Sequence, residues 1–355
     1  MDLNKPQNFS KIDKDNMLQH IIDFPSQCEE TFNDMQNFFI PTHYIKIKNV
    51  VILGMGGSAI GGDLAKSLAI EQSKIPIYVV RDYHIPGFVN SDSLVIGSSY
   101  SGETEETLAA FEQAGKRGAK MVVVSSGGKL ASVGSQYRAP FYQINYGSQP
   151  RAALGFSLMS IICILQKIGV IAFEKEEIKE AILILKGYER KLRPEVPFHA
   201  NSAKQIAQRV FDRIPIVYAS GSLTNVGLRW KTQFNENAKT AAFSENLPEL
   251  CHNSVVGYDF PKKMRDEIFT IMLQSKYDHP RTQLRANIII SILQRKRIPY
   301  ESVFIQQANS SFSEMLCAIT LGDYSSYYLA MLNNVDPTPV EIINYLKDRL
   351  AGSKK

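Results

Sequence analysis

Short apolar runs that end in glycine or serine, each followed by a helical pattern, constrain the fold of this chain most strongly. In the first half, "VVILGMGG" begins at Val50 and "DSLVIGSSYSG" begins at Asp92. Apolar runs of this length, bounded by turn residues, are typical of strands buried on both faces. Helices between such strands cover both faces of a sheet, so the pattern predicts an α/β fold with doubly wound parallel sheets.

The second half of the chain repeats this layout. Strand-like runs at 214–223, 266–274 and 300–306 alternate with helical stretches at 225–240, 281–297 and 310–332, the last with an expected break at Gly322. A final helix is expected after Pro339, with Thr338 as its candidate cap. We therefore expect a helical segment over 1–40, a first α/β domain over 41–190, and a second over 191–355 that includes the C-terminal helix.

Composition and charge exclude several classes of protein. The formal charge of +5 comes from 40 basic and 35 acidic residues without a basic run, so a nucleic-acid partner is not expected. The longest apolar run, near "FSLMSIICIL", falls short of the roughly 20 residues that span a membrane, so no membrane partner is expected. Four scattered cysteines and a polar N-terminus predict free thiols, no zinc site, no signal peptide and a cytoplasmic location.

The first of two Ser/Gly turns reads "GMGGSAIGGD" from Gly54. Its glycines can bring backbone N–H groups close to a ligand at the start of a helix, where Ser58 stands. Two alternatives remain open. Ser58 can be a simple helix cap, or Gly54, Gly56 and Ala59 can form a loose dinucleotide fingerprint with Asp82 as its acidic partner.

The second turn reads "SSYSGETEET" over 98–107 and also leads from a strand into a helix. Ser99, Ser101 and Thr104 can all donate hydrogen bonds to phosphate oxygens above the positive end of that helix. The alternative is a hydroxyl-rich helix cap with no ligand. Glu105 and Glu106 are favourable in the first turn of a helix even without a ligand, whereas Glu103 has no assigned role.

Several stretches in order along the chain carry a family resemblance. "GMGGSAIGGDL" followed by "SYSGETEETL" resembles a sugar isomerase (SIS) domain. Together with "VVRDYHIP", "SQPRAALG", "TQFNENAKTAAFSENLPELCHNSVVG" and "VDPTPVEIINYLKDRL", they resemble the bifunctional phosphoglucose/phosphomannose isomerases, a branch of the phosphoglucose isomerase superfamily. The resemblance covers nearly the whole chain. It implies two SIS-type domains, each a doubly wound parallel sheet of the flavodoxin-like kind, with flanking helices.

The resemblance implies a phosphate site made by the two turns. The family's phosphate-binding residues match Ser58, Ser99, Ser101 and Thr104, with the backbone of Gly57 beside the substrate.

The resemblance also implies the catalytic residues. The active-site arginine matches Arg151, the catalytic base matches Glu236, and a lysine matches Lys347. The ring-opening histidine matches His252, which in this family reaches the active site across the interface of a homodimer. The family's usual His-Asn-Glu ends here in Ser254. Taken singly, each of these residues also has an ordinary structural interpretation.

The implied activity is aldose–ketose isomerisation of glucose 6-phosphate, and also of mannose 6-phosphate, to fructose 6-phosphate, a step of glycolysis and gluconeogenesis. One carboxylate can move a proton between C2 and C1 through a cis-enediolate, so neither a metal nor another cofactor is required. The main alternative is a non-catalytic phosphosugar-binding regulatory protein. An aminosugar enzyme would need a glutaminase domain, which 40 N-terminal residues cannot hold.

Overall fold

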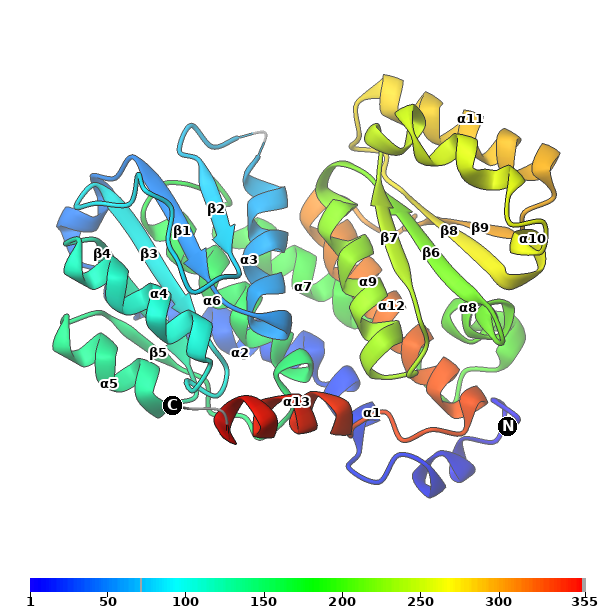
Figure 1. Ribbon diagram of the computed structural model, residues 1–355, viewed down its shortest axis with the longest axis horizontal. Coiled ribbons are helices and arrows are strands. Elements are labelled where there is room, and N and C mark those ends of the chain that lie inside the picture. The colour runs from blue at the N-terminus through cyan, green and yellow to red at the C-terminus, as the bar shows by residue number, and fades with distance from the viewer. Residues whose placement is uncertain (71, 353–355) are drawn as a thin grey trace.

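Two parallel sheets organise the computed structural model, which describes residues 1–70 and 72–352 (Figure 1). The first has the strand order β2-β1-β3-β4-β5 and the second the order β7-β6-β8-β9. The order 2-1-3-4-5 is the flavodoxin-like form of a doubly wound sheet, so the predicted fold class is confirmed. It differs from the order 3-2-1-4-5-6 of dinucleotide-binding domains, which removes support from the dinucleotide alternative.

The first sheet is buried on both faces. Its strands are β1 (Asn49–Leu53), β2 (Ile77–Val80), β3 (Ser93–Ser98), β4 (Lys120–Ser125) and β5 (Phe141–Gln143). Along β1, Val50 and Ile52 point into a core shared with α2 (Phe24–Gln36), α3 (Gly56–Ala69) and α6 (Leu154–Lys167). Val51 and Leu53 point into a second core under α4 (Glu105–Lys116) and α5 (Gly128–Gln136). This alternation explains the continuous apolar run.

The second sheet follows the same plan. Its strands are β6 (Ile214–Ala219), β7 (Phe243–Asn246), β8 (Ile268–Gln274) and β9 (Tyr300–Phe304). One face packs on α8 (Ser202–Val210), α9 (Thr224–Glu236) and α12 (Ser311–Asn333), through Val217 and Ile271. The other packs on α11 (Pro280–Lys296), through Tyr218 and Met272.

The remaining elements flank these layers. The other α-helices are α1 (Met17–Ile22), α7 (Lys175–Glu189), α10 (Met264–Glu267) and α13 (Glu341–Gly352). Short 3-10 helices are η1 (Pro6–Lys11), η2 (Thr42–Ile45), η3 (Pro150–Ala153), η4 (Phe198–Ala200), η5 (Gly221–Leu223), η6 (Glu249–His252) and η7 (Ser254–Asp259). Within the described ranges, no helix combines the length and the apolar character needed to cross a membrane.

The two sheets meet through α3 and α9, which run antiparallel. At the start of α9, Asn225 Nδ2 donates to Asp63 O at 3.0 Å and to Ser67 Oγ at 2.7 Å, both in the second half of α3. The last turn of α9 therefore lies beside the first turn of α3, at the carboxyl edge of the first sheet. Ligands of such sheets bind at this edge.

Helix α12 is continuous, so the break expected at Gly322 is wrong. A Cβ atom at Gly322 would lie 2.3 Å from Trp230 Nε1. The Trp230 indole is fully buried, and its Nε1 donates to Ala318 O at 2.8 Å. Glycine is required here for the close approach of the indole.

We predict that Gly322→Ala lowers the free energy of unfolding by about 1–3 kcal/mol, because the added methyl group overpacks this contact. Gly187 of α7 is the matched control, since a Cβ atom there meets nothing within 4 Å. Gly187→Ala should be neutral, or stabilising by up to about 1 kcal/mol, through helix propensity. Denaturant unfolding of both variants measures the difference, and equal stabilities would contradict the packing account.

Candidate active site

The two Ser/Gly turns are hydrogen-bonded to each other. The Tyr100 N–H donates to Ser58 Oγ at 3.0 Å, and Ser98 Oγ donates to Ser58 O at 2.9 Å. Helix α3 begins at Gly56 with Met55 as its N-cap, and no side chain caps it. The interpretation of Ser58 as a simple cap is therefore wrong, because its hydroxyl belongs to the contact between the turns.

The hydroxyl groups of the second turn lie together at the start of α4. Ser99 Oγ lies 2.9 Å from Thr104 Oγ1, while the exposed Ser101 accepts a hydrogen bond from Glu103 N at 3.3 Å. Thr104 occupies the N-cap position, but its side chain makes no capping hydrogen bond. The alternative of a hydroxyl-rich cap is therefore not supported, and the positive helix end faces the hydroxyl cluster.

Glu103 points away from this cluster. Its carboxylate accepts from Lys129 N at 2.9 Å and pairs with Lys129 Nζ at 2.9 Å, at the start of α5. The hydrogen bonds from Lys129 lower the pKa of Glu103. Glu103 lies between Ser101 and Thr104 in the sequence, but its carboxylate contacts the neighbouring helix α5.

Arg151 brings a carboxylate to the same edge of the sheet. Its guanidinium Nε donates to Asn237 Oδ1 at 2.8 Å, and Nη1 lies 3.3 Å from Glu236 Oε2, both residues at the end of α9. The Arg151 side chain is 2% exposed and that of Glu236 is 26% exposed. Gly57 permits this approach, since a Cβ atom there would lie 2.8 Å from Arg151 N. Burial lowers the pKa of Arg151, and the Glu236 charge opposes the shift.

The same guanidinium holds the C-terminal segment. Arg151 Nη2 donates to Pro337 O at 2.7 Å and to Thr338 O at 2.9 Å. Helix α13 begins only at Glu341, so Thr338 is not the cap that its position suggested. The segment before α13 instead packs against the Arg151 guanidinium through these two carbonyl groups.

A buried ion pair supports Arg151 from behind. Arg229 Nη2 donates to Arg151 O at 2.8 Å, while Arg229 pairs with Asp323 of α12 through Nε at 3.1 Å and Nη2 at 2.8 Å. Sequence reasoning missed Asn237, Arg229 and Asp323. A signal existed for Asp323, because it is one of two charged residues, with Glu314, in the largely uncharged sequence of α12.

Two of the predicted residues do not join this cluster within the chain. His252 follows β7 in the chain. Directly after β7, Leu247 N donates to Ala219 O at 2.9 Å. This segment therefore lies at the end of the second sheet where α9 begins. Glu236 is at the other end of α9, about 20 Å away along a helix of 13 residues. His252 is exposed, and no hydrogen bond or ion pair reaches its side chain from the described part of the chain.

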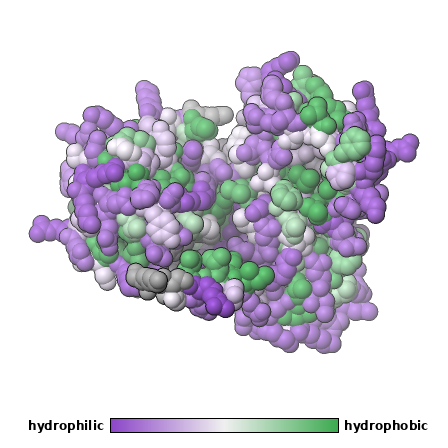
Figure 2. Space-filling model, in the orientation of Figure 1, coloured by the Kyte–Doolittle hydropathy of each residue, from purple (hydrophilic) through white to green (hydrophobic). Residues whose placement is uncertain are grey.

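Lys347 lies on α13, where every described side chain is exposed. Apolar side chains of this helix also face solvent, among them Ile342, Tyr345 and Leu346, and an apolar patch is visible there in Figure 2. In the view of Figure 1, α13 runs from the end of α12 toward the first domain.

Ser254 stands where the family usually has a glutamate, but the carboxylate of Glu245 lies beside it. Ser254 Oγ donates to Glu245 Oε2 of β7, an interaction that neither residue's position in the sequence indicated.

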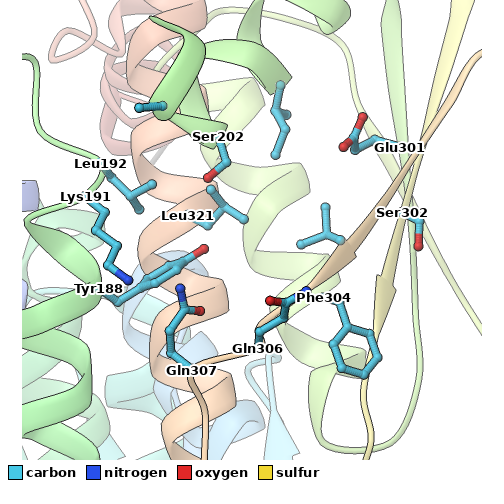
Figure 3. A pocket seen from close by; sticks show the side chains of 13 residues that line it. Tyr188, Lys191, Leu192, Ser202, Glu301, Ser302, Phe304, Gln306, Gln307 and Leu321 are labelled. Atoms are coloured by element: carbon cyan, nitrogen blue, oxygen red, sulfur yellow. The ribbon is translucent and has the colours of Figure 1, made fainter. Parts of the chain in front are cut away.

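A separate cavity of about 270 Å³ lies in the second domain between α7, α8, α12 and β9 (Figure 3). Lys191, Tyr188 and Gln307 gather on one side of it, and Glu301 and Ser302 lie on the other. It contains none of the predicted site residues.

We predict that Asp323→Asn lowers the free energy of unfolding by about 3–5 kcal/mol, because Arg229 is left as a buried cation without a counter-charge. Asp348→Asn, at an exposed position of α13, is the control and should change it by less than about 0.5 kcal/mol. Urea unfolding measures both variants, and a stability equal to that of wild type in Asp323→Asn would contradict a supporting role for the pair.

Comparison with known proteins adds the family. A model described as the bacterial phospho-glucose isomerase C-terminal SIS domain matches residues 199–350, and an SIS domain model matches residues 43–132. The bifunctional phosphoglucose/phosphomannose isomerase of Caldicellulosiruptor bescii is 37% identical over 95% of this chain and 100% of its own length. Its counterpart in Aquifex aeolicus is 34% identical over 91% of this chain and 98% of its own length.

Solved structures agree on the fold. The C-terminal domain of glucosamine-fructose-6-phosphate aminotransferase from Francisella tularensis superposes with a TM-score of 0.72 at 16% identity, covering 91% of this chain and 98% of that one. At this identity the similarity shows the shared fold alone. The identities to the curated relatives, over nearly their whole lengths, establish more: the chain belongs to the bifunctional phosphoglucose/phosphomannose isomerase family.

Proposed function

We propose that the protein is an isomerase that interconverts glucose 6-phosphate, and mannose 6-phosphate, with fructose 6-phosphate. The observation that carries this proposal is the Glu236 carboxylate, which is held by Arg151 beside the hydroxyl-lined turns of the first domain. A phosphate at those turns would place the other end of the sugar near Glu236. A protein that only bound phosphosugars would not need this partly exposed carboxylate.

The proposed phosphate site uses Ser58, Ser99, Ser101 and Thr104, with the backbone of Gly57. The positive ends of α3 and α4 meet there, and neither helix is capped by its own side chain, which supports anion binding. Binding energy from a phosphate remote from the reacting carbons positions those carbons for reaction.

The proposed chemistry moves one proton between two carbons. Glu236 removes the proton from C2 of the open aldose, the C1 carbonyl electrons move to O1, and a cis-enediolate forms. Protonated Glu236 returns the proton to C1 while the hydroxyl proton of O2 passes to O1, which leaves the C2 ketone. Arg151 stabilises the developing oxyanion with its positive charge. No metal or redox cofactor takes part in this scheme.

Ring opening is proposed to need His252 of a second copy, together with Lys347. The distance of His252 from Glu236 within one chain, and its exposure, support a site shared across a homodimer. Exposed apolar side chains of the second domain support such an interface, namely Val256, Phe260, Leu284 and Ile288.

The division into segments 1–40, 41–190 and 191–355 also remains a proposal, supported by one sheet in each of the two larger segments. The proposed location is the cytoplasm, which is supported by four cysteines that are all free thiols.

We predict that Glu236→Gln lowers kcat on both aldose phosphates by about 10²–10⁴-fold, because the amide cannot accept the proton. Affinity for fructose 6-phosphate should stay within about threefold, since the phosphate is bound elsewhere. Coupled assays and calorimetry measure the two quantities, with the exposed Glu112→Gln on α4 as control. Turnover of glucose 6-phosphate alone by wild type would rule out the bifunctional activity, and binding without turnover of either would favour the regulatory alternative.

We predict that His252→Ala and Glu236→Gln proteins, each inactive alone, recover activity when mixed. Each mixed dimer has one intact site, and random exchange makes mixed dimers about half of the total, so recovery should reach about a quarter of wild-type activity. Native mass spectrometry verifies the exchange. If mixed dimers form and remain inactive, the two residues do not share a site across an interface.

A further inference from the structure

Lys239 connects the turn that carries Glu236 to the C-terminal segment. It lies where the backbone leaves α9, with a left-handed φ of 55°. Its Nζ donates to Glu236 O at 2.5 Å and to Pro337 O at 3.2 Å. The residue as a whole is exposed, whereas its ammonium group is partly buried. The ammonium group thus bridges two segments that are 98 residues apart.

The end of a helix is a demanding place for a catalytic base. The last carbonyl groups of a helix have no partners within it, and its negative end disfavours a carboxylate. Glu236 is the last residue of α9, so both costs fall on it. Lys239 supplies a donor to the Glu236 carbonyl, and Lys239 and Arg151 together supply two cations near the Glu236 side chain.

The C-terminal segment follows this turn along its length. Asn333 Nδ2 donates to Ala238 O at 2.9 Å and to Thr240 Oγ1 at 3.0 Å. Pro337 O accepts from Arg151 Nη2 at 2.7 Å as well as from Lys239. Lys239 is therefore one of two cationic side chains that fasten the segment before α13 to the base.

We propose that Lys239 is a positioning residue for the isomerase reaction, which holds the last turn of α9, and with it Glu236, against the 336–338 segment. This inference rests on the proposed function for its effect on turnover. The contacts themselves do not depend on it.

The Lys239 ammonium titrates in an accessible range. Burial and the Arg151 charge lower the pKa of Lys239 to about 8, against the opposing charges of Asp336 and Glu236. Above this pH the bridge loses its charge. A plot of kcat/KM against pH should therefore fall on its alkaline side, with a midpoint near pH 8. Because the unfolded chain holds this proton more tightly than the folded state does, the charge of Lys239 lowers the free energy of unfolding at pH 7, and this cost is lost as the pH rises through about 8.

The kinetic experiment compares Lys239→Met, Lys239→Arg and the control Lys231→Met, whose residue lies within α9. Lys239→Met should lower kcat about 10- to 100-fold at pH 7, as expected for a misplaced base, with KM within about threefold and the melting temperature unchanged. Lys239→Arg, which stays charged, should keep most of the activity and lose the limb near pH 8. Lys231→Met should match wild type in both kcat and pH profile.

Two further readouts need no turnover. Hydrogen exchange should be faster in Lys239→Met than in wild type for peptides covering 233–241 and 334–345. Competitive acetylation, followed by peptide mass spectrometry, should give Lys239 a pKa near 8. If wild type isomerises neither aldose phosphate, the proposed function fails while faster exchange still supports the bridge. Unchanged exchange, or wild-type kcat and pH profile in Lys239→Met, overturns the proposal.

Discussion

The Arg151 guanidinium is the interaction on which the site depends. With three nitrogens it holds Asn237, Glu236 and two carbonyl groups of the C-terminal segment, while its own carbonyl is held by Arg229. A guanidinium suits this place because it presents five donors in a fixed plane and stays charged when buried. Without it, the first domain, the end of α9 and the segment before α13 would have no common partner.

The antiparallel packing of α3 and α9 explains why Arg151 has these neighbours. It places the end of a second-domain helix at the carboxyl edge of the first-domain sheet, where the start of α3 and the second Ser/Gly turn also lie. The first domain thereby supplies the hydroxyl groups and helix N-termini of the proposed anion site, and the second supplies the Glu236 carboxylate. The same packing leaves the turn that carries His252 at the far end of α9, which is the physical reason for considering a second copy.

Much of the fold could be predicted from the sequence because its strands are buried on both faces. β1, β3, β6 and β8 are continuous apolar runs, and periodicity identifies such runs well. β7 was missed because "FSEN" forms a half-exposed edge strand without an apolar pattern. α5 was missed because its sequence "GKLASVGSQ" starts with a helix-breaking glycine and has few apolar residues. The bend expected in α12 failed because the glycine serves packing against Trp230 rather than a turn.

The site was predictable in part. Residue type and position after a strand indicated the hydroxyl turns, whereas the pairing of Arg151 with Glu236 spans 85 positions and depends on how the two domains pack. Only the family resemblance linked those residues beforehand. Asn237 and Lys239 act through amide and backbone contacts that no sequence pattern shows. Arg229 acts through its ion pair with Asp323 and its hydrogen bond to a backbone carbonyl, which the sequence does not show either.

A crystal structure with fructose 6-phosphate bound tests the central claim most directly, that one site is assembled from both domains. The account predicts the phosphate among the Ser58, Ser99 and Thr104 hydroxyl groups, C1 and C2 beside the Glu236 carboxylate, and His252 of a second copy at the ring oxygen. A sugar phosphate bound elsewhere, such as in the cavity between α7 and β9, or one whose C1 and C2 lie out of reach of Glu236, would contradict it.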